Sequence, residues 1–232
     1  MRELQDIISR IGLHAAIKLL RSALFSVTIG LNDSINNYLA PVISEAERKL
    51  IPPETFVGIL IARLRLQITR LYNMGASKIV VVNVGPINCI PYQREVNQAD
   101  PESCAEFSNQ LARSFNAKLR TLVTELNKNL PHGANFVYAD VHSIVEDFIE
   151  NYISYGFENT NPACCRVAGR YGGLIPCGPQ PSKFCVDWSK YMFWDPYHPS
   201  DASNYTIIAR RLLYGNSSDI SPMNVVQLLQ AS

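Results

Sequence analysis

The run KIVVVNVG, residues 78–85, constrains the fold of this chain more than any other stretch of its sequence. β-Branched residues follow one another there with little polar interruption, which is typical of a parallel strand buried on both faces. A helical pattern precedes the run over residues 52–75, with two prolines at its start and Gly75 at its end. A longer amphipathic pattern follows it, with large apolar residues three or four positions apart: Phe107, Leu111, Phe115, Leu119, Leu122, Leu126 and Leu130. A buried strand between two helices predicts an α/β fold.

The rest of the chain extends this alternation to a βαβαβα order. Two further strands are predicted, over residues 23–29 and 135–141. The remaining predicted helices occupy residues 3–21, 143–151 and 200–214, and a long loop rich in Cys, Gly and Pro occupies residues 152–193. This order predicts a three-layer sandwich around a parallel sheet, with right-handed crossovers and a functional site at the carboxyl ends of the strands.

The size of the chain favours one domain. Its 232 residues, 47% of them hydrophobic, suffice for a single α/β core and are too few for two comfortable ones. We place the domain at residues 1–215 and interpret residues 216–232 as a polar C-terminal tail.

Charge and hydropathy restrict the partners of the protein. The formal net charge of +1, with both signs interspersed, gives no basic stripe for a phosphate backbone, so no nucleic-acid partner is expected. No apolar run approaches the roughly 20 residues of a membrane-spanning helix. The N-terminal MRELQDIISR has no apolar signal core, and the sequence as written therefore predicts a soluble protein, cytoplasmic if it starts at Met1.

Six cysteines point to a different compartment. They lie in Pro/Gly-rich loops or at helix starts, which favours disulfides formed under oxidising conditions, with reduced structural thiols as the alternative. Six cysteines allow 15 pairings, and the sequence does not select one. Metal binding is the weaker interpretation, because two of them are adjacent and all four histidines lie elsewhere, so no metal and no cofactor is expected. The cysteines are Cys89, Cys104, Cys164, Cys165, Cys177 and Cys185.

The segment FWDPYHPSDASN contains the pair of residues best suited to acid–base catalysis. Asp195 and His198 lie three positions apart on a proline-stiffened turn before the last helix. A carboxylate at this spacing can bind Nδ1 of the imidazole and leave Nε2 available as a general base. The alternative is a structural turn, in which Asp195 accepts backbone N–H groups, His198 is a surface residue, and Ser200 or Asp201 caps the helix.

Six segments, taken together, resemble a known family. They are ALFSVTIGLNDSINNY, LYNMGASKIVVVNVGPINCIPYQRE, NFVYADV, YGFENTNPACC, GGLIPCGP and YMFWDPYHPSDASN, in this order from about residue 3 to residue 215. They resemble the plant GDSL esterase/lipase family of the SGNH hydrolase superfamily, which implies a flavodoxin-like sandwich and serine-dependent hydrolysis of carboxylic or lipid esters. The resemblance also implies a secreted protein that takes part in lipid degradation.

The resemblance assigns roles to two blocks of this sequence. Residues 30–33 match the Gly-x-Asn-Asp block of the family, which makes Asn32 the donor to an oxyanion. Asp195 and His198 match its Asp-x-x-His block, with His198 as the general base and Asp195 as the residue that orients it. The nucleophile block, Gly-Asp-Ser-Leu, and a glycine block have no counterpart here and would lie upstream of Met1, as would the secretion signal of the family.

Ser34 is the remaining candidate nucleophile, since NDSI looks like a drifted GDSL. We assign no nucleophile to this chain, because Ser34 falls inside the oxyanion block, where a turn hydroxyl that bonds nearby backbone is expected. The resemblance therefore implies a fold incomplete at its N-terminus and an ester hydrolase with negligible activity as given. Its substrate would be a small ester or lipid in the full-length form. The alternative function is that of a non-catalytic relic or interaction protein, which associates through an exposed edge strand at residues 23–29.

Overall fold

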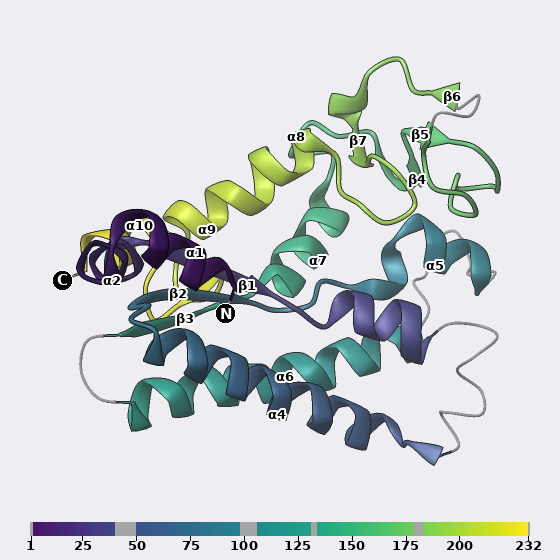
Figure 1. The fold of residues 1–232 in the computed structure, drawn as a ribbon. Helices are drawn as coiled ribbons and strands as arrows, with labels where there is room; N and C mark the ends of the chain where they lie inside the picture. The colour runs from purple at the N-terminus through teal and green to yellow at the C-terminus, as the bar shows by residue number, and fades with distance from the viewer. Residues whose placement is uncertain (1, 40–49, 98–105, 131–133, 179–182, 232) are drawn as a thin grey trace.

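The computed structural model describes residues 2–39, 50–97, 106–130, 134–178 and 183–231 (Figure 1). These residues form a four-stranded sheet in the order β1-β2-β3-β8, in which β8 alone runs antiparallel to its neighbour. The sheet confirms the predicted α/β sandwich, and the predicted strands at its centre. The strands are β1 (Leu24–Thr28), β2 (Lys78–Val82), β3 (Asn135–Ala139) and β8 (Ile220–Ser221).

Helices cover both faces of this sheet, as Figure 1 shows. On one face α4 (Pro53–Asn73) and α6 (Glu106–Asn129) lie side by side. The other face carries α7 (Val141–Asn151), α9 (Arg210–Tyr214) and α10 (Val225–Gln230). Alternate residues of β2 and β3 are buried under the two layers, which is why the apolar run of β2 is continuous. Ile79, Val81, Phe136 and Tyr138 belong to one core cluster, and Val80, Val137 and Ala139 to the other.

The predicted helix over residues 3–21 is instead two helices. These are α1 (Arg2–Ile11) and α2 (Leu13–Ser22), and Gly12 separates them. Gly12 has φ +79°, a left-handed conformation that glycine adopts without a steric penalty and that ends a right-handed helix. The apolar periodicity runs through Gly12 and therefore did not reveal the break.

The predicted polar tail, residues 216–232, continues the fold in its described part. Its residues form β8 and α10, with Ile220 and Leu228 fully buried against the sheet. Asn224 and Gln227 form a capping box at the start of α10. The polar residues that suggested a tail are therefore the cap and turns of a short closing unit, whose apolar residues are few but buried.

The predicted long loop, residues 152–193, is a small structured lobe. Residues 159–194, called the stapled lobe here, contain two two-stranded sheets, β4 with β7 and β5 with β6. Disulfides join Cys164 to Cys185 and Cys165 to Cys177, which confirms that the cysteines are paired. Cys89 is also disulfide-bonded, whereas Cys104 and His132 lie outside the described residues. The elements are β4 (Asn159–Ala163), β5 (Cys165–Arg166), β6 (Lys183–Phe184), η3 (Trp188–Lys190) and β7 (Tyr191–Phe193).

Strand β1 is an edge of the described sheet. It pairs in parallel with β2 and with no other described strand, and Leu24, Ser26 and Thr28 are exposed. The remaining described elements connect the strands to the site: η1 (Asp33–Tyr38), η2 (Ile87–Cys89), α5 (Pro91–Val96), α8 (Asp201–Ser203) and η4 (Asn204–Ala209). No helix in the described ranges is both long and apolar enough to cross a membrane.

Candidate active site

The side chains of Asp195 and His198 form a hydrogen-bonded pair. Nδ1 of His198 lies 2.9 Å from each carboxylate oxygen of Asp195. Because a carboxylate accepts hydrogen bonds, Nδ1 carries the proton, and Nε2 of a neutral imidazole is then the basic nitrogen. Asp195 is largely shielded, with 15% of its side chain exposed, while 72% of the His198 side chain is exposed. The pair thus combines a shielded, fixed acid with an accessible base.

Backbone contacts fix this pair in its turn. Oδ1 of Asp195 also accepts the N–H groups of Tyr197 and His198, both at 2.8 Å, so the carboxylate contacts the imidazole and the backbone of the turn at the same time. The N–H of Trp194 donates to the carbonyl of His198 at 2.9 Å. Ser200 follows the turn and caps α8, as its side chain accepts the N–H of Ser203. The carboxylate is therefore held from three directions and keeps the imidazole in one orientation.

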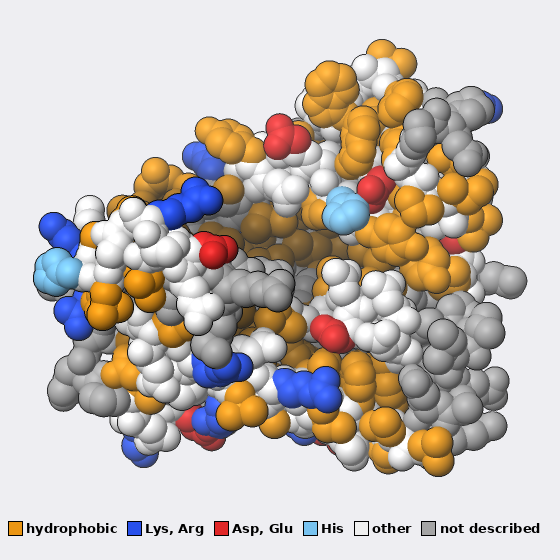
Figure 2. All heavy atoms as spheres, viewed as in Figure 1, with side chains coloured by type: hydrophobic (Ala, Val, Ile, Leu, Met, Phe, Trp, Pro, Cys, Tyr) orange, Lys and Arg blue, Asp and Glu red, His pale blue; other side chains and the backbone are white. Residues whose placement is uncertain are grey.

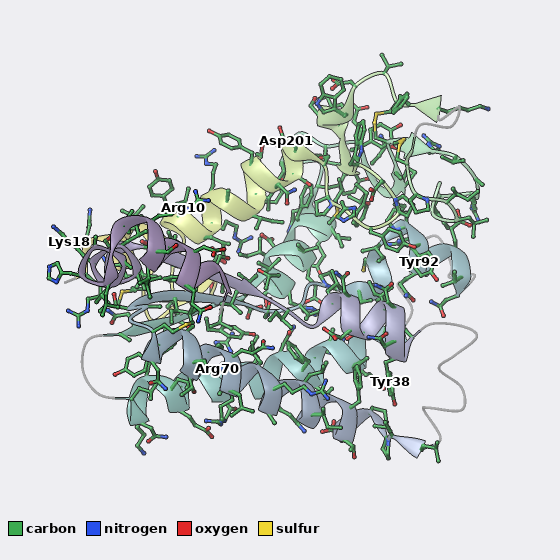
Figure 3. All side chains as sticks on the ribbon, in the orientation of Figure 1. Arg10, Lys18, Tyr38, Arg70, Tyr92 and Asp201 are labelled. Atoms are coloured by element: carbon green, nitrogen blue, oxygen red, sulfur yellow. A yellow bond between two sulfur atoms is a disulfide. The ribbon has the colours of Figure 1, made fainter. Side chains whose placement is uncertain are left out.

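Helix α5 contacts the turn that carries Asp195 and His198. The N–H of Tyr92, a residue labelled in Figure 3, donates to the carbonyl of Pro196 at 3.1 Å. The ring of Tyr92 lies 5.0 Å from that of Tyr197. Burial raises the pKa of the Tyr197 phenol, and the neighbouring Tyr92 and Asp195 raise it further, so this phenol stays protonated at neutral pH. The two rings pack on each other, and Tyr197 also lines the cavity beside His198.

A cavity of about 500 Å³ opens beside His198 at the carboxyl ends of β1 and β2. Figure 2 shows a hollow with a hydrophobic floor in this face of the molecule. Four segments far apart in sequence meet in its wall: residues 28–33, 82–90, 141–148 and 192–208. The polar side chains of the wall include Asn32, Asn83 and His198. The apolar residues that line it are Ile29, Leu31, Val82, Val84, Ile87, Ile90, Val141, Val145, Phe148, Met192, Phe193 and Ile208.

Asn32 shares this cavity with His198. It is exposed at the start of η1, and its side-chain amide forms no hydrogen bond within the described part of the chain. Gly30 shapes the turn that carries it, with φ +115° and a buried position against Phe115 of α6. A Cβ at position 30 would lie 2.9 Å from the ring of Phe115, so only glycine fits. The turn therefore presents an unpaired amide to the cavity.

Ser34 does not line the cavity. Its side chain is buried, and its hydroxyl donates to the carbonyl of Gly30 at 2.7 Å. Ser203 does line the cavity, but its hydroxyl faces the carbonyls of Met192 and Ser200 at 2.9 and 3.0 Å. In the described part of the chain, the imidazole of His198 hydrogen-bonds only Asp195.

A buried polar network, which the sequence patterns did not indicate, supports the cavity wall. Asn83 donates to the Tyr138 hydroxyl and to the Asp140 carboxylate, both at 2.8 Å, and accepts the N–H of His142 at 3.0 Å. Arg120 binds the other carboxylate oxygen of Asp140 at 2.6 Å. Burial raises the pKa of Tyr138, with the charge of Asp140 as the next cause. The available signal was two polar residues, Asn83 and Asp140, each directly after a buried strand.

His142 lies beside this network. It is buried, and its Nδ1 lies 3.1 Å from the carbonyl of Val84, a cavity-lining residue. Within the described ranges, His, Cys, Asp and Glu side chains form no group of three that could hold a metal ion.

Comparison of the sequence with known proteins identifies relatives of this chain. Residues 1–212 match the family model described as GDSL-like lipase/acylhydrolase. GDSL esterase/lipase At4g16230 of Arabidopsis thaliana is 59% identical over 97% of this chain and 60% of its own length. From the same organism, GDSL esterase/lipase At2g23540 is 50% identical over 90% of this chain and 53% of its own length, and GDSL esterase/lipase At3g50400 is 47% identical over 90% and 55%. The chain thus spans a little more than half the length of these relatives.

Proposed function

Because the chain belongs to the GDSL-like lipase/acylhydrolase family, we propose that it supplies the base and one oxyanion donor of a serine-dependent ester hydrolase. The observation that carries this proposal is one cavity lined by both Asn32 and His198, with Asp195 fixed behind the imidazole. The substrates are carboxylic esters, among them small esters and lipids, because the cavity wall is mostly apolar.

The chemistry follows from these positions. Nε2 of His198 takes the proton of a serine hydroxyl as the serine oxygen attacks the ester carbonyl. The carbonyl oxygen becomes an oxyanion, and the amide of Asn32 donates a hydrogen bond to it. The proton on Nε2 then passes to the alcohol that leaves, and Asp195 stabilises the imidazolium in between. A water molecule releases the acyl group by the same steps.

No serine among the described residues is placed for this attack, which supports a chain with negligible activity on its own. Ser34 and Ser203 direct their hydroxyls at backbone carbonyls. The nucleophile would come from a Gly-Asp-Ser-Leu segment of the family, which this sequence lacks. Loss of a triad serine costs on the order of a millionfold in turnover in a serine protease, with the remainder due to binding and the oxyanion hole.

The exposed edge β1 favours the second candidate, a non-catalytic interaction protein. An edge strand with unpaired backbone groups pairs readily with another strand. Association through residues 23–29 would explain retention of the fold without the chemistry. The disulfides of the stapled lobe support a secreted protein under either function, because disulfides persist in oxidising compartments.

A fluorophosphonate probe, which reacts with activated serines, separates the two functions. We expect no labelling of the 232-residue chain. We expect labelling of a completed chain, in which this chain is joined to a family segment that carries the Gly-Asp-Ser-Leu block. His198→Ala should abolish that labelling, and His14→Ala, at an exposed position of α2, should leave it unchanged. A completed, folded chain that stays unlabelled would favour the interaction protein, and a labelled serine in the chain alone would refute the assigned roles.

A further inference from the structure

A second hollow lies beside the cavity, on the stapled lobe. It has a volume of about 420 Å³, and its lining residues are Trp188, Trp194, Pro199, Asp201 and Asn204, called the tryptophan groove here. Pro199 lines both hollows, so the groove adjoins the cavity of Asn32 and His198. In Figure 2 hydrophobic side chains gather on this outer end of the lobe, and Figure 3 shows Asp201 at the start of α8.

The indole ring of Trp194 is packed on a neighbour, and the backbone turn that carries Trp188 is capped. Trp188 lies in η3, whose first turn is capped by Asp187, as its carboxylate accepts the N–H of Ser189 at 2.9 Å. Trp194 stacks on Phe184 with 6.0 Å between ring centroids and 28° between planes. The Cys164–Cys185 disulfide ties this segment to β4 and β5. The Trp194 side of the groove is therefore ordered before any ligand binds, which reduces the entropy lost on binding.

The polar residues of the groove are unpaired. Asp201 and Asn204 are exposed, and within the described residues their side chains make no hydrogen bond or ion pair. Trp188 is 57% exposed, which is unusual for so large an apolar side chain. The groove thus combines flat aromatic faces with a carboxylate acceptor and a carboxamide that both donates and accepts.

We propose that the tryptophan groove binds a neutral sugar ring. A pyranose offers a C–H face that packs on an indole ring and a rim of hydroxyls that a carboxylate and a carboxamide bind. Resting on the proposed ester hydrolysis, this makes the substrate an acylated carbohydrate, with the acyl group in the apolar cavity. Trp194 and Pro199 directly flank the Asp195–His198 turn, so a sugar in the groove places its ester at that pair.

A lipid surface fits the groove less well. An acyl chain or bilayer over the groove would take Asp201 and Asn204 out of water without giving them partners, which is costly for a carboxylate. A sugar hydroxyl satisfies both residues. The volume of the groove lies within the range of about 300–1,000 Å³ that is common for small-molecule sites.

Tryptophan emission reports on this groove alone, because the chain contains two tryptophans and both line it. The 232-residue chain is made in bacteria with its disulfides oxidised, which leaves Asn204, part of an Asn-Tyr-Thr sequon, without a glycan. Xylohexaose and cellohexaose are titrated separately, with 1,6-hexanediol as the non-sugar control. We expect a saturable blue shift of the emission with at least one oligosaccharide and none with the diol.

Variants connect the shift to the groove. Trp188→Ala should weaken binding about tenfold, followed through the emission of Trp194, and Asp201→Ala, at an exposed position, should weaken it about fivefold. Tyr214→Ala, an exposed aromatic on α9, should leave the affinity unchanged. Melting curves check that each variant is folded, and if Trp188→Ala fails to fold, Trp188→Phe replaces it with a smaller loss of affinity expected.

Each outcome bears on the proposal. Absence of a shift with both oligosaccharides overturns it, as does binding that neither Trp188→Ala nor Asp201→Ala weakens. A shift with phosphatidylcholine vesicles in place of sugars also overturns it, and indicates a lipid-facing surface. Sugar binding together with a completed chain that hydrolyses no ester refutes the proposed function and leaves the groove assigned. Ester hydrolysis without sugar binding does the reverse.

Discussion

Gly30→Ala tests whether the turn that carries Asn32 is fixed by its glycine. The backbone at Gly30 has φ +115°, where an L side chain is strained by about 1–2 kcal/mol. The added Cβ would also lie 2.9 Å from the Phe115 ring, which is buried in α6, and overpacking of this kind costs about 1–3 kcal/mol. We therefore expect a loss of about 2–5 kcal/mol in the free energy of unfolding.

Thermal unfolding followed by circular dichroism measures this loss. In a chain of this size 1 kcal/mol shifts Tm by about 2–4 °C, so the expected fall is about 4–20 °C. Gly58→Ala is the matched control, because Gly58 lies inside α4 with ordinary helical φ and nothing within 4 Å of an added Cβ. Alanine there should stabilise the helix by about 0.5–1 kcal/mol.

A double-mutant cycle separates the two causes. Phe115→Leu removes the ring edge that the new Cβ would meet, so Gly30→Ala should cost about 1–3 kcal/mol less in that background and keep only its backbone strain. Equal Tm values for Gly30→Ala and the unchanged protein would refute the reasoning, as would Tm changes of the same sign at positions 30 and 58.

Three further predictions follow from other contacts. Asn83→Leu should lower the free energy of unfolding, measured by urea unfolding, by about 2–3 kcal/mol, because the Tyr138 hydroxyl, the Asp140 carboxylate and the His142 N–H lose a buried partner. A change below about 0.5 kcal/mol would contradict this. The hydrogen bond from Tyr155 lowers the pKa of Asp147, so this carboxylate stabilises the fold above about pH 4 and loses its effect as pH falls through its folded pKa. Tyr155→Phe should therefore reduce the fall in Tm on acidification, measured between about pH 2 and 6, and an unchanged profile would contradict this. The double variant Cys164→Ser with Cys185→Ser should lose about 2–4 kcal/mol of the free energy of unfolding and shift the tryptophan emission to the red, while the far-ultraviolet circular dichroism stays the same. Unchanged emission would show that the disulfide does not order the two indoles.

Local patterns predicted the centre of the fold well. The β-branched run at residues 78–82 forms the central strand β2, and the prolines and Gly75 bracket α4 as expected. These features act through neighbours in sequence, so sequence alone reveals them. The helix break at Gly12 is an exception, because an isolated glycine in a helical pattern does not by itself predict a positive φ.

Non-local pairing explains what the sequence did not predict. Strand β4 pairs with β7 about thirty residues later, and the antiparallel pairing of β5 with β6 brings Cys164 beside Cys185. The closing unit of β8 and α10 is too short for a periodic pattern, although Ile220 and Leu228 are fully buried. Such elements are stabilised by packing on the rest of the fold, and their own residues show no clear periodic pattern.

In the candidate site, too, local contacts were predictable from the sequence and contacts between distant segments were not. The contact of Asp195 with His198 depends on a three-residue spacing within one turn, and the sequence indicated it. The meeting of Asn32 with His198 in one cavity depends on the order of β1 and β2 in the sheet, and only the family resemblance suggested it. The support from Asn83 and the tryptophan groove depend on contacts between separate elements, which residue patterns alone do not reveal.

Ester hydrolysis by the completed chain tests the central claim, that this chain holds the base and an oxyanion donor of an ester hydrolase. The measurement is kcat/KM for p-nitrophenyl butyrate, with variants made only in the part that this chain provides. We predict a loss on the order of a thousandfold or more for His198→Ala, about a hundredfold or more for Asn32→Ala, and none for His14→Ala. A completed chain that hydrolyses the ester and keeps its rate within about tenfold after His198→Ala would contradict the account.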